Sequence, residues 1–244
     1  MTTTTKGLVI REQTIGESDR LVTLLTADWG LVRAFVRGAK QVKSKLASST
    51  SLFAYSDFSL YRGRDAFSIN NAVPIEVFFD LRKDIVRLAL AQYFAQLAYE
   101  LAEEEQPANE MLSVLLNSLH LLCHSGKDLR IIKSAVEFRL MCLSGYMPNI
   151  LACAECATYE TNIMYFDTLN GCIYCSNCPK EGAAVCPKNV ITAIRYICLT
   201  EPKKIFSFNL SEENTQLLSQ ISEKYLLTRV QKKLPTLEFY KALQ

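Results

Sequence analysis

The most informative part of the sequence is a pair of matching cysteine segments, Cys153-Ala-Glu-Cys156 and Cys175-Ser-Asn-Cys178. Eighteen residues separate them, so the pattern is C-x2-C-x18-C-x2-C. Two residues between cysteines let a tight turn direct both thiolates at one ion, and four thiolates complete the tetrahedral shell of Zn²⁺. We therefore predict a zinc finger in which Cys153, Cys156, Cys175 and Cys178 bind one structural Zn²⁺.

Two further cysteines leave the ligand set open. Cys172 precedes Cys175 at the same C-x2-C spacing, and Cys186 follows the second pair closely enough to replace a ligand. We prefer Cys175 and Cys178, because Gly171-Cys172 is typical of the turn before a second pair. The alternative to a metal site is a set of unrelated core thiols.

The composition is that of a globular protein. The chain has 244 residues, of which 49% are hydrophobic and 21% charged, so it can bury a core without disulfides. Nine cysteines without a signal peptide indicate a reducing compartment, and we expect a cytoplasmic location. Every long apolar run is interrupted by polar residues, so we expect no membrane span.

Residues 1–79 show the pattern of short β-strands. Alternating apolar residues predict strands at 6–12, 20–26, 31–37, 51–61 and 66–73, with Pro74 ending the last one. Five short strands within this length predict a small closed barrel, of which the OB-fold is one common type.

Positive charge is concentrated between residues 33 and 64. This stretch holds seven basic residues and a single acid, Asp57, which is the charge distribution expected of a nucleic-acid groove. The candidate DNA-binding residues are Arg33, Arg37, Lys40, Lys43, Lys45, Arg62 and Arg64. The alternative is a solvated basic loop, at residues 38–51, that binds nothing.

Aromatic residues are interleaved with these charges and could stack on bases. They are Trp29, Phe35, Tyr55 and Tyr61. For Phe35, as for Phe58, we favour packing in the core.

Helical periodicity begins at residue 80. It predicts helices at 80–105, 109–123, 129–143, 187–198 and 211–228, with Ser211 as an N-cap and a short last helix opened by Pro235. We predict an α+β chain with a barrel domain at 1–79, a helical domain at 80–150 and 187–244, and an inserted zinc finger at 151–186.

The motifs of common catalytic sites are absent from the sequence. The two histidines, His120 and His124, have the spacing of an H-E-x-x-H pair without its glutamate, and we interpret them as polar positions of a packed helix. No phosphate-binding loop, dinucleotide-binding glycine pattern or zinc-deaminase motif occurs. We therefore expect a binding protein with no catalytic residues, not an enzyme.

The order of these parts resembles the RecO family of bacterial recombination-repair mediators. The segments that carry the resemblance are 16–26, 29–40, 138–148 with the first cysteine pair, 171–178 and 225–243. One departure is Cys172, where the family usually has a second glycine.

The resemblance implies a nucleoid-associated protein that binds single- and double-stranded DNA and anneals strands coated with single-strand-binding protein. It also implies that the protein acts with RecR to load the recombinase, without a small-molecule substrate or a membrane. DNA contacts would be made to phosphate by the seven basic residues above. One rival interpretation is a zinc-finger scaffold that binds proteins and no DNA. The other is an enzyme such as a metal-dependent nuclease, but the sequence offers no carboxylate cluster with suitable spacing beyond the glutamates at 103–105, at the end of a predicted helix.

Overall fold

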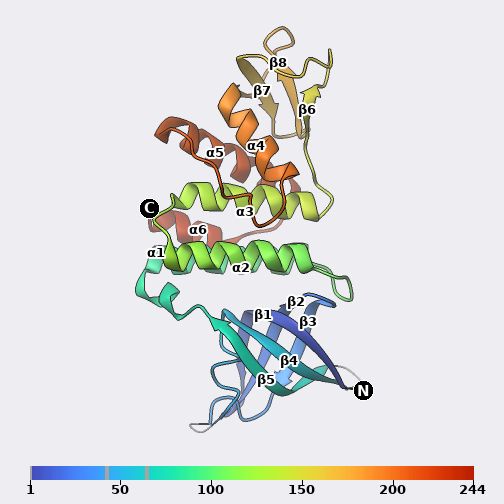
Figure 1. Ribbon diagram of the computed structural model, residues 1–244, viewed down its shortest axis with the longest axis vertical. Coiled ribbons are helices and arrows are strands. Elements are labelled where there is room, and N and C mark those ends of the chain that lie inside the picture. Colours follow the sequence, from blue (N-terminus) through green and yellow to red (C-terminus); the bar gives the residue numbers. More distant parts are fainter. Residues whose placement is uncertain (1, 42–43, 64–65) are drawn as a thin grey trace. The chain divides into compact units, whose positions relative to one another are not determined.

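The structure is a computed structural model that describes residues 2–41, 44–63 and 66–244 (Figure 1). The chain divides into two compact units. The N-terminal unit comprises residues 1–125 together with 234–244, and the central unit comprises residues 126–233. This grouping by contacts places the first two long helices and the last helix with the barrel. The domain boundaries inferred from the sequence, at 79, 150 and 186, stay a prediction.

Five strands of the N-terminal unit form a closed barrel, as predicted. Their order around the barrel is β1-β2-β3-β5-β4, with β3 and β5 parallel and the other neighbours antiparallel. The strands are β1 (Thr2–Ile15), β2 (Asp19–Thr26), β3 (Gly30–Val36), β4 (Ala54–Arg62) and β5 (Phe67–Val77).

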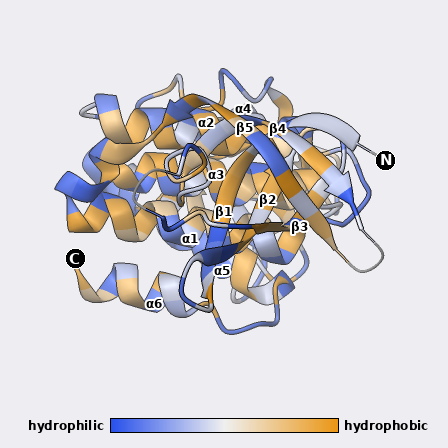
Figure 2. Cartoon of the chain, turned by 90° about the horizontal axis from the view of Figure 1, so that it is seen from below, coloured by the Kyte–Doolittle hydropathy of each residue, from blue (hydrophilic) through white to orange (hydrophobic). Residues whose placement is uncertain are grey.

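Alternation along β3 sets the two faces of the barrel wall. Val32, Ala34 and Val36 are buried inside, whereas Arg33 and Phe35 are exposed, because successive side chains of a strand point to opposite faces. Figure 2 shows the corresponding alternation of hydrophobic and hydrophilic segments along the barrel strands. The barrel core is therefore filled from within by small and branched apolar side chains.

The last barrel strand is longer than predicted. β5 continues through Pro74 to Val77, so the expectation that Pro74 ends the strand is wrong. Pro74 pairs with Ser56 where the register shifts between Tyr55 and Ser56. A bulge of this kind tolerates a residue without a backbone N–H, which explains how a proline fits inside the strand.

Helices α1 (Ile85–Leu101), α2 (Asn109–His124) and α6 (Pro235–Ala242) complete the N-terminal unit. Asp84 caps α1 by accepting hydrogen bonds from the backbone N–H groups of Val86 and Arg87. A short 3-10 helix, η1 (Phe79–Lys83), precedes this cap. The helix predicted at 80–105 is thus wrong at both ends, because η1 is separate and residues 102–106 are not helical, with Glu104 bridged to Gly30.

The central unit combines three helices with a second sheet. The helices are α3 (Leu129–Leu143), α4 (Lys188–Leu199) and α5 (Glu212–Arg229), and the strands, in the order β6-β8-β7-β9, are β6 (Asn149–Cys153), β7 (Ile163–Asp167), β8 (Cys172–Cys175) and β9 (Ala184–Pro187). Ser211 caps α5 as predicted, with its side chain accepting from the Asn214 N–H. The sheet was not predicted from the sequence. Within the described ranges, no helix is both long and apolar enough to cross a bilayer.

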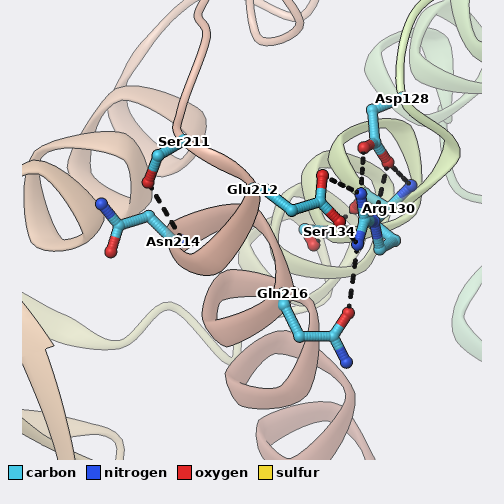
Figure 3. Close-up of polar contacts among 7 residues, drawn as sticks. All are labelled: Asp128, Arg130, Ser134, Ser211, Glu212, Asn214 and Gln216. Atoms are coloured by element: carbon cyan, nitrogen blue, oxygen red, sulfur yellow. Dashed lines mark hydrogen bonds and ion pairs between the residues drawn. The ribbon is translucent and has the colours of Figure 1, made fainter.

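Arg130 joins the N-terminal ends of α3 and α5 (Figure 3). Its guanidinium donates two hydrogen bonds to Glu212, at 2.7 and 2.9 Å, and also contacts both oxygens of Asp128. The hydrogen bond and charge of Arg130 lower the pKa of both carboxyl groups. Forked pairing of this kind fixes direction as well as distance, so it helps to align the two helices.

A buried ion pair lies further along the same two helices. Lys133 Nζ is 2.8 Å from Glu137 Oε1 and 2.9 Å from Glu223 Oε2, and the Ser222 hydroxyl donates to the other oxygen of Glu137. The Glu137 side chain is fully buried. Because an unpaired charge there would be strongly unfavourable, these contacts select one alignment of α3 against α5.

Candidate nucleic-acid interface and metal centre

A pocket of about 470 Å³ lies on the outer face of the barrel. Its lining includes Trp29, Arg33, Phe35, Arg62, Phe67 and Glu105. Phe35 is 40% exposed, so the expectation that it packs in the core is wrong, whereas Phe58 is buried as expected. Phe35 is exposed because successive side chains of β3 alternate, and its neighbours Ala34 and Val36 point into the barrel.

The structure brings two of the predicted DNA-binding residues together in this pocket. Arg33 Nη2 donates to the Tyr99 hydroxyl at 3.0 Å, and Arg62 Nη2 lies 2.8 Å from Glu105 Oε1. The Arg62 guanidinium also lies over the Phe67 ring. More than half of the Arg62 and Glu105 side chains is exposed, so their ion pair is weak and can exchange for another anion.

Residues 103–106, which follow α1 and are called the turn below, reach the pocket through backbone contacts with the start of β3. The Leu31 N–H donates to the Glu103 carbonyl at 3.1 Å, and the Glu105 N–H donates to the Trp29 carbonyl at 3.0 Å. The turn thus places acidic side chains beside Arg62. The helical pattern placed the three glutamates at 103–105 at the end of the predicted helix 80–105, and no local pattern signals this long-range contact.

Three of the remaining predicted DNA contacts are described by the structure, and none of them lines the pocket. Arg37 is exposed immediately after β3, and Lys40 and Lys45 are exposed in the following segment. Lys43 and Arg64 lie outside the described residues. The segment at 38–51 is only partly solvated, since Ser49 and Thr50 are fully buried.

The four predicted metal ligands lie together in the central unit. One sulfur each from Cys153, Cys156, Cys175 and Cys178 lies within 4.8 Å of the others. The Sγ atoms of Cys156 and Cys175 are 3.5 Å apart. Zn–S bonds of about 2.3 Å place tetrahedral sulfurs about 3.8 Å apart, so this donor set fits Zn²⁺.

Backbone hydrogen bonds form the two turns that present these sulfurs. The Ala157 N–H donates to the Cys153 carbonyl at 2.9 Å, and the Cys178 N–H donates to the Cys175 carbonyl at 3.0 Å. Ala157 has a φ of 59°, which is uncommon for a residue with a side chain. A residue in the left-handed conformation, Ala157, therefore directly follows Cys156 in the turn that brings the Cys153 and Cys156 thiols together.

Electrostatics within the cluster favour a bound cation. The hydrogen bond between Cys156 and Thr158 lowers the pKa of Cys156 to about 6, and the hydrogen bond between Cys178 and Cys156 raises the pKa of Cys178 to about 12. Four adjacent thiols cannot all ionise by themselves, because their negative charges repel. A divalent ion removes that repulsion and would leave no coordination position open for a substrate.

Cys172 and Cys186, the two alternative ligands, are engaged elsewhere. The Cys172 thiol lies 3.5 Å from the Tyr174 hydroxyl. The Cys186 thiol donates to the Ala184 carbonyl at 3.4 Å, and burial raises its pKa to about 12. Neither belongs to the group of converging sulfurs.

Arg195 connects α4 to the first cysteine pair. From a buried position it donates hydrogen bonds to the carbonyls of Ile150 at 2.7 Å, Leu151 at 3.1 Å and Tyr159 at 2.6 Å. These carbonyls lie on β6 and on the segment after Cys156. Arg195 thus braces the backbone on either side of the first cysteine pair. The sequence gave no indication of this role, since a lone arginine in an apolar helix resembles any exposed cation.

Comparison with known protein families accounts for nearly the whole chain. Residues 1–78 match the family model for the N-terminal part of recombination protein O, and residues 82–238 match the model for its C-terminal part. The chain belongs to the recombination protein O family, RecO.

Named RecO relatives cover the chain almost from end to end. DNA repair protein RecO of Acetivibrio thermocellus is 33% identical over 241 residues, which are 98% of this chain and 96% of the relative. DNA repair protein RecO of Alkaliphilus metalliredigens is 29% identical over 93% of both chains. DNA repair protein RecO of Dehalococcoides mccartyi is 30% identical over 89% of this chain and 85% of its own.

Proposed function

We propose that this protein binds single- and double-stranded DNA through the outer face of β3 and anneals complementary strands in recombinational DNA repair. The observation that carries the proposal is the exposed row Arg33, Phe35 and Arg37, with Arg62 in the same pocket as Arg33 and Phe35. The names of the RecO relatives support the same role.

Each residue type has a distinct part in this proposal. The guanidinium groups bind phosphate oxygens, and the exposed ring of Phe35 offers a surface on which a base can stack. Arg62 exchanges Glu105 for a phosphate, since both side chains are largely exposed. Contacts of this kind bind any sequence, and they bring two strands together by screening the repulsion between their backbones.

The other parts of the proposal follow from the barrel and the finger. We infer that the barrel is an OB-fold. We also infer that one Zn²⁺, bound by the four cysteines, stabilises the folded central unit and has no other role. The protein would work without catalytic turnover, in the cytoplasm at the nucleoid. Its partners would be RecR and single-strand-binding protein, with which it loads the recombinase.

A salt-dependent titration with fluorescent single-stranded DNA tests the proposal. The variant Arg33→Ala/Arg37→Ala/Lys40→Ala removes three exposed cations. Each neutralised phosphate contributes about −0.7 to the slope of log affinity against log salt, so the slope should become shallower by about 2. The loss of affinity should be similar for unrelated DNA sequences, because phosphate contacts do not read bases.

The variant Arg82→Ala/Lys203→Ala/Lys224→Ala serves as the matched control. It removes the same charge from other exposed positions, and it should keep the wild-type slope. Melting curves of both variants show whether each protein is folded. Equal slopes for the β3 variant and the wild type would exclude this face as the DNA site, and an equal effect of the control would mean that binding follows net charge alone.

A second candidate function, a scaffold that binds proteins and no DNA, is favoured by apolar residues on the small sheet. Leu151, Ile163 and Val185 are each more than 40% exposed. The same titration separates the two functions, because a scaffold would show no affinity for DNA at any salt concentration.

A further inference from the structure

A second group of potential metal ligands lies in the N-terminal unit, far in sequence from the cysteines. His120 and His124 stand one helical turn apart on α2, with ring centroids 4.7 Å apart. Glu76, near the end of β5, places its Oε1 3.9 Å from His120 Nδ1. One ligand atom from each of the three residues lies within 4.8 Å of the other two, and all three are exposed.

The charges around this group favour a cation. Glu76 faces the His120 imidazole, and Asp80 on η1 lies near enough to His124 to interact with it electrostatically, while its Oδ1 is 2.8 Å from Lys83 Nζ. The imidazoles therefore lie in a field to which two carboxylates contribute.

The donor set indicates the class of ion. Two imidazoles and one carboxylate suit borderline divalent transition ions, whereas Mg²⁺ and Ca²⁺ prefer oxygen ligands alone. Bonds of about 2.0–2.1 Å to a tetrahedral ion place the donors about 3.3 Å apart. The present separation of 3.9 Å is close to that value, and exposed side chains can close the difference by rotating about their own bonds.

We propose that Glu76, His120 and His124 form a second metal site, which binds one Zn²⁺ or similar divalent ion and clips the end of β5 to α2. The helix supplies two ligands because residues i and i+4 share a face, and the strand supplies the third. Three protein ligands leave a coordination position for water. The site differs from the four-cysteine cluster in its ligands, its exposure and its place in the chain, so it fills independently and after that cluster.

The two histidines of the chain make this site directly observable, because both lie in it. Full-length protein labelled with ¹⁵N, and already holding one equivalent of Zn²⁺, is titrated with further Zn²⁺ while the imidazole nitrogens are followed by NMR. Both imidazoles should shift together and saturate at one additional equivalent, which calorimetry counts.

Single-residue variants test each ligand. The affinity for the second equivalent of Zn²⁺ should fall by at least about tenfold in each of three variants, His120→Ala, His124→Ala and Glu76→Gln. Even residues that only hydrogen-bond to metal ligands contribute that much to metal affinity. Glu110→Gln, an exposed position on the same helix, is the matched control and should bind as the wild type does. Fluorescence of Trp29 shows that the N-terminal unit of each variant is folded.

The proposed link between β5 and α2 through the metal ion is tested by the stability of the N-terminal unit. Additional Zn²⁺ should raise the unfolding midpoint of the N-terminal unit in the wild type and in Glu110→Gln, but much less in Glu76→Gln. Imidazole signals that do not move in a several-fold excess of Zn²⁺ would overturn the site. Wild-type affinity in Glu76→Gln would overturn the clip, because the helix would then bind the ion by itself.

Discussion

Replacing Gly30 by alanine should destabilise the N-terminal unit, because the turn at 103–106 lies directly against this residue. A Cβ at position 30 would be 2.1 Å from the Glu103 carbonyl oxygen and 2.6 Å from that of Gln106. Both atoms belong to the backbone, so the turn itself must move. That movement weakens the two hydrogen bonds, from Leu31 to Glu103 and from Glu105 to Trp29, that attach the turn to β3.

The expected loss of free energy follows from three contributions. Gly30 has a φ of 61°, and an alanine in this region costs about 1–2 kcal/mol. Two weakened hydrogen bonds add about 1–3 kcal/mol. The lower entropy of the unfolded alanine chain offsets about 0.4–1 kcal/mol. Gly16→Ala is the matched control, since Gly16 has a φ of 58° and nothing within 4 Å of its Cβ position. The difference between the variants, roughly 2 kcal/mol, therefore isolates the contact with the turn.

Urea unfolding followed by tryptophan fluorescence measures this difference. Trp29, the single tryptophan of the chain, adjoins Gly30 and packs against the barrel core, so its emission reports the N-terminal unit. We expect a lower midpoint with an unchanged slope for Gly30→Ala, and a smaller change for Gly16→Ala. Equal losses in the two variants would refute the reasoning, because the turn would then place no constraint on position 30.

Three further predictions concern the central unit. Cys153→Ser should lose the metal and melt at a lower temperature than the wild type. Cys172→Ser should retain the metal and the wild-type melting temperature, and zinc content and melting curves measure both effects. Arg195→Met leaves three backbone carbonyls without their donor and should cost about 3 kcal/mol, measured by urea unfolding, with weaker zinc retention against a chelator. Asp128 has a pKa lowered first by its hydrogen bond from Arg130, so its contribution is present above the unfolded pKa of about 3.9 and is lost as pH falls through the folded value. Asp128→Asn should therefore melt at a lower temperature than the wild type at pH 7, with the difference disappearing in strong acid; a constant difference would contradict this.

Local patterns in the sequence predicted most of the elements. Alternation identified the five barrel strands, because burial on one face of a strand requires a period of two. Residues 129–143 were identified as a helix with the bounds that the structure has, and Ser211 was identified as a cap. These features depend on residues within a few positions of one another, so the sequence carries them directly.

Features that depend on distant partners were missed or misplaced. The strands of the small sheet have only four or five residues each, and they become strands because they pair around the cysteine turns. Pro74 stays within a strand because a bulge in the neighbouring register accepts it. Glu105 leaves the helical pattern because its backbone bonds to Trp29.

The candidate sites likewise combine features that the local sequence carries with features that depend on distant partners. The sequence alone identified the four cysteines whose sulfurs converge, since a C-x2-C turn brings the two thiols of each pair together. It also determined that basic residues gather in the barrel. Only the tertiary structure decided that Phe35 faces outward beside Arg33 and Arg62, and that Glu76 meets His120 and His124. Closing a barrel and packing a helix against it bring together residues far apart in the chain, and no local pattern specifies which of them will meet.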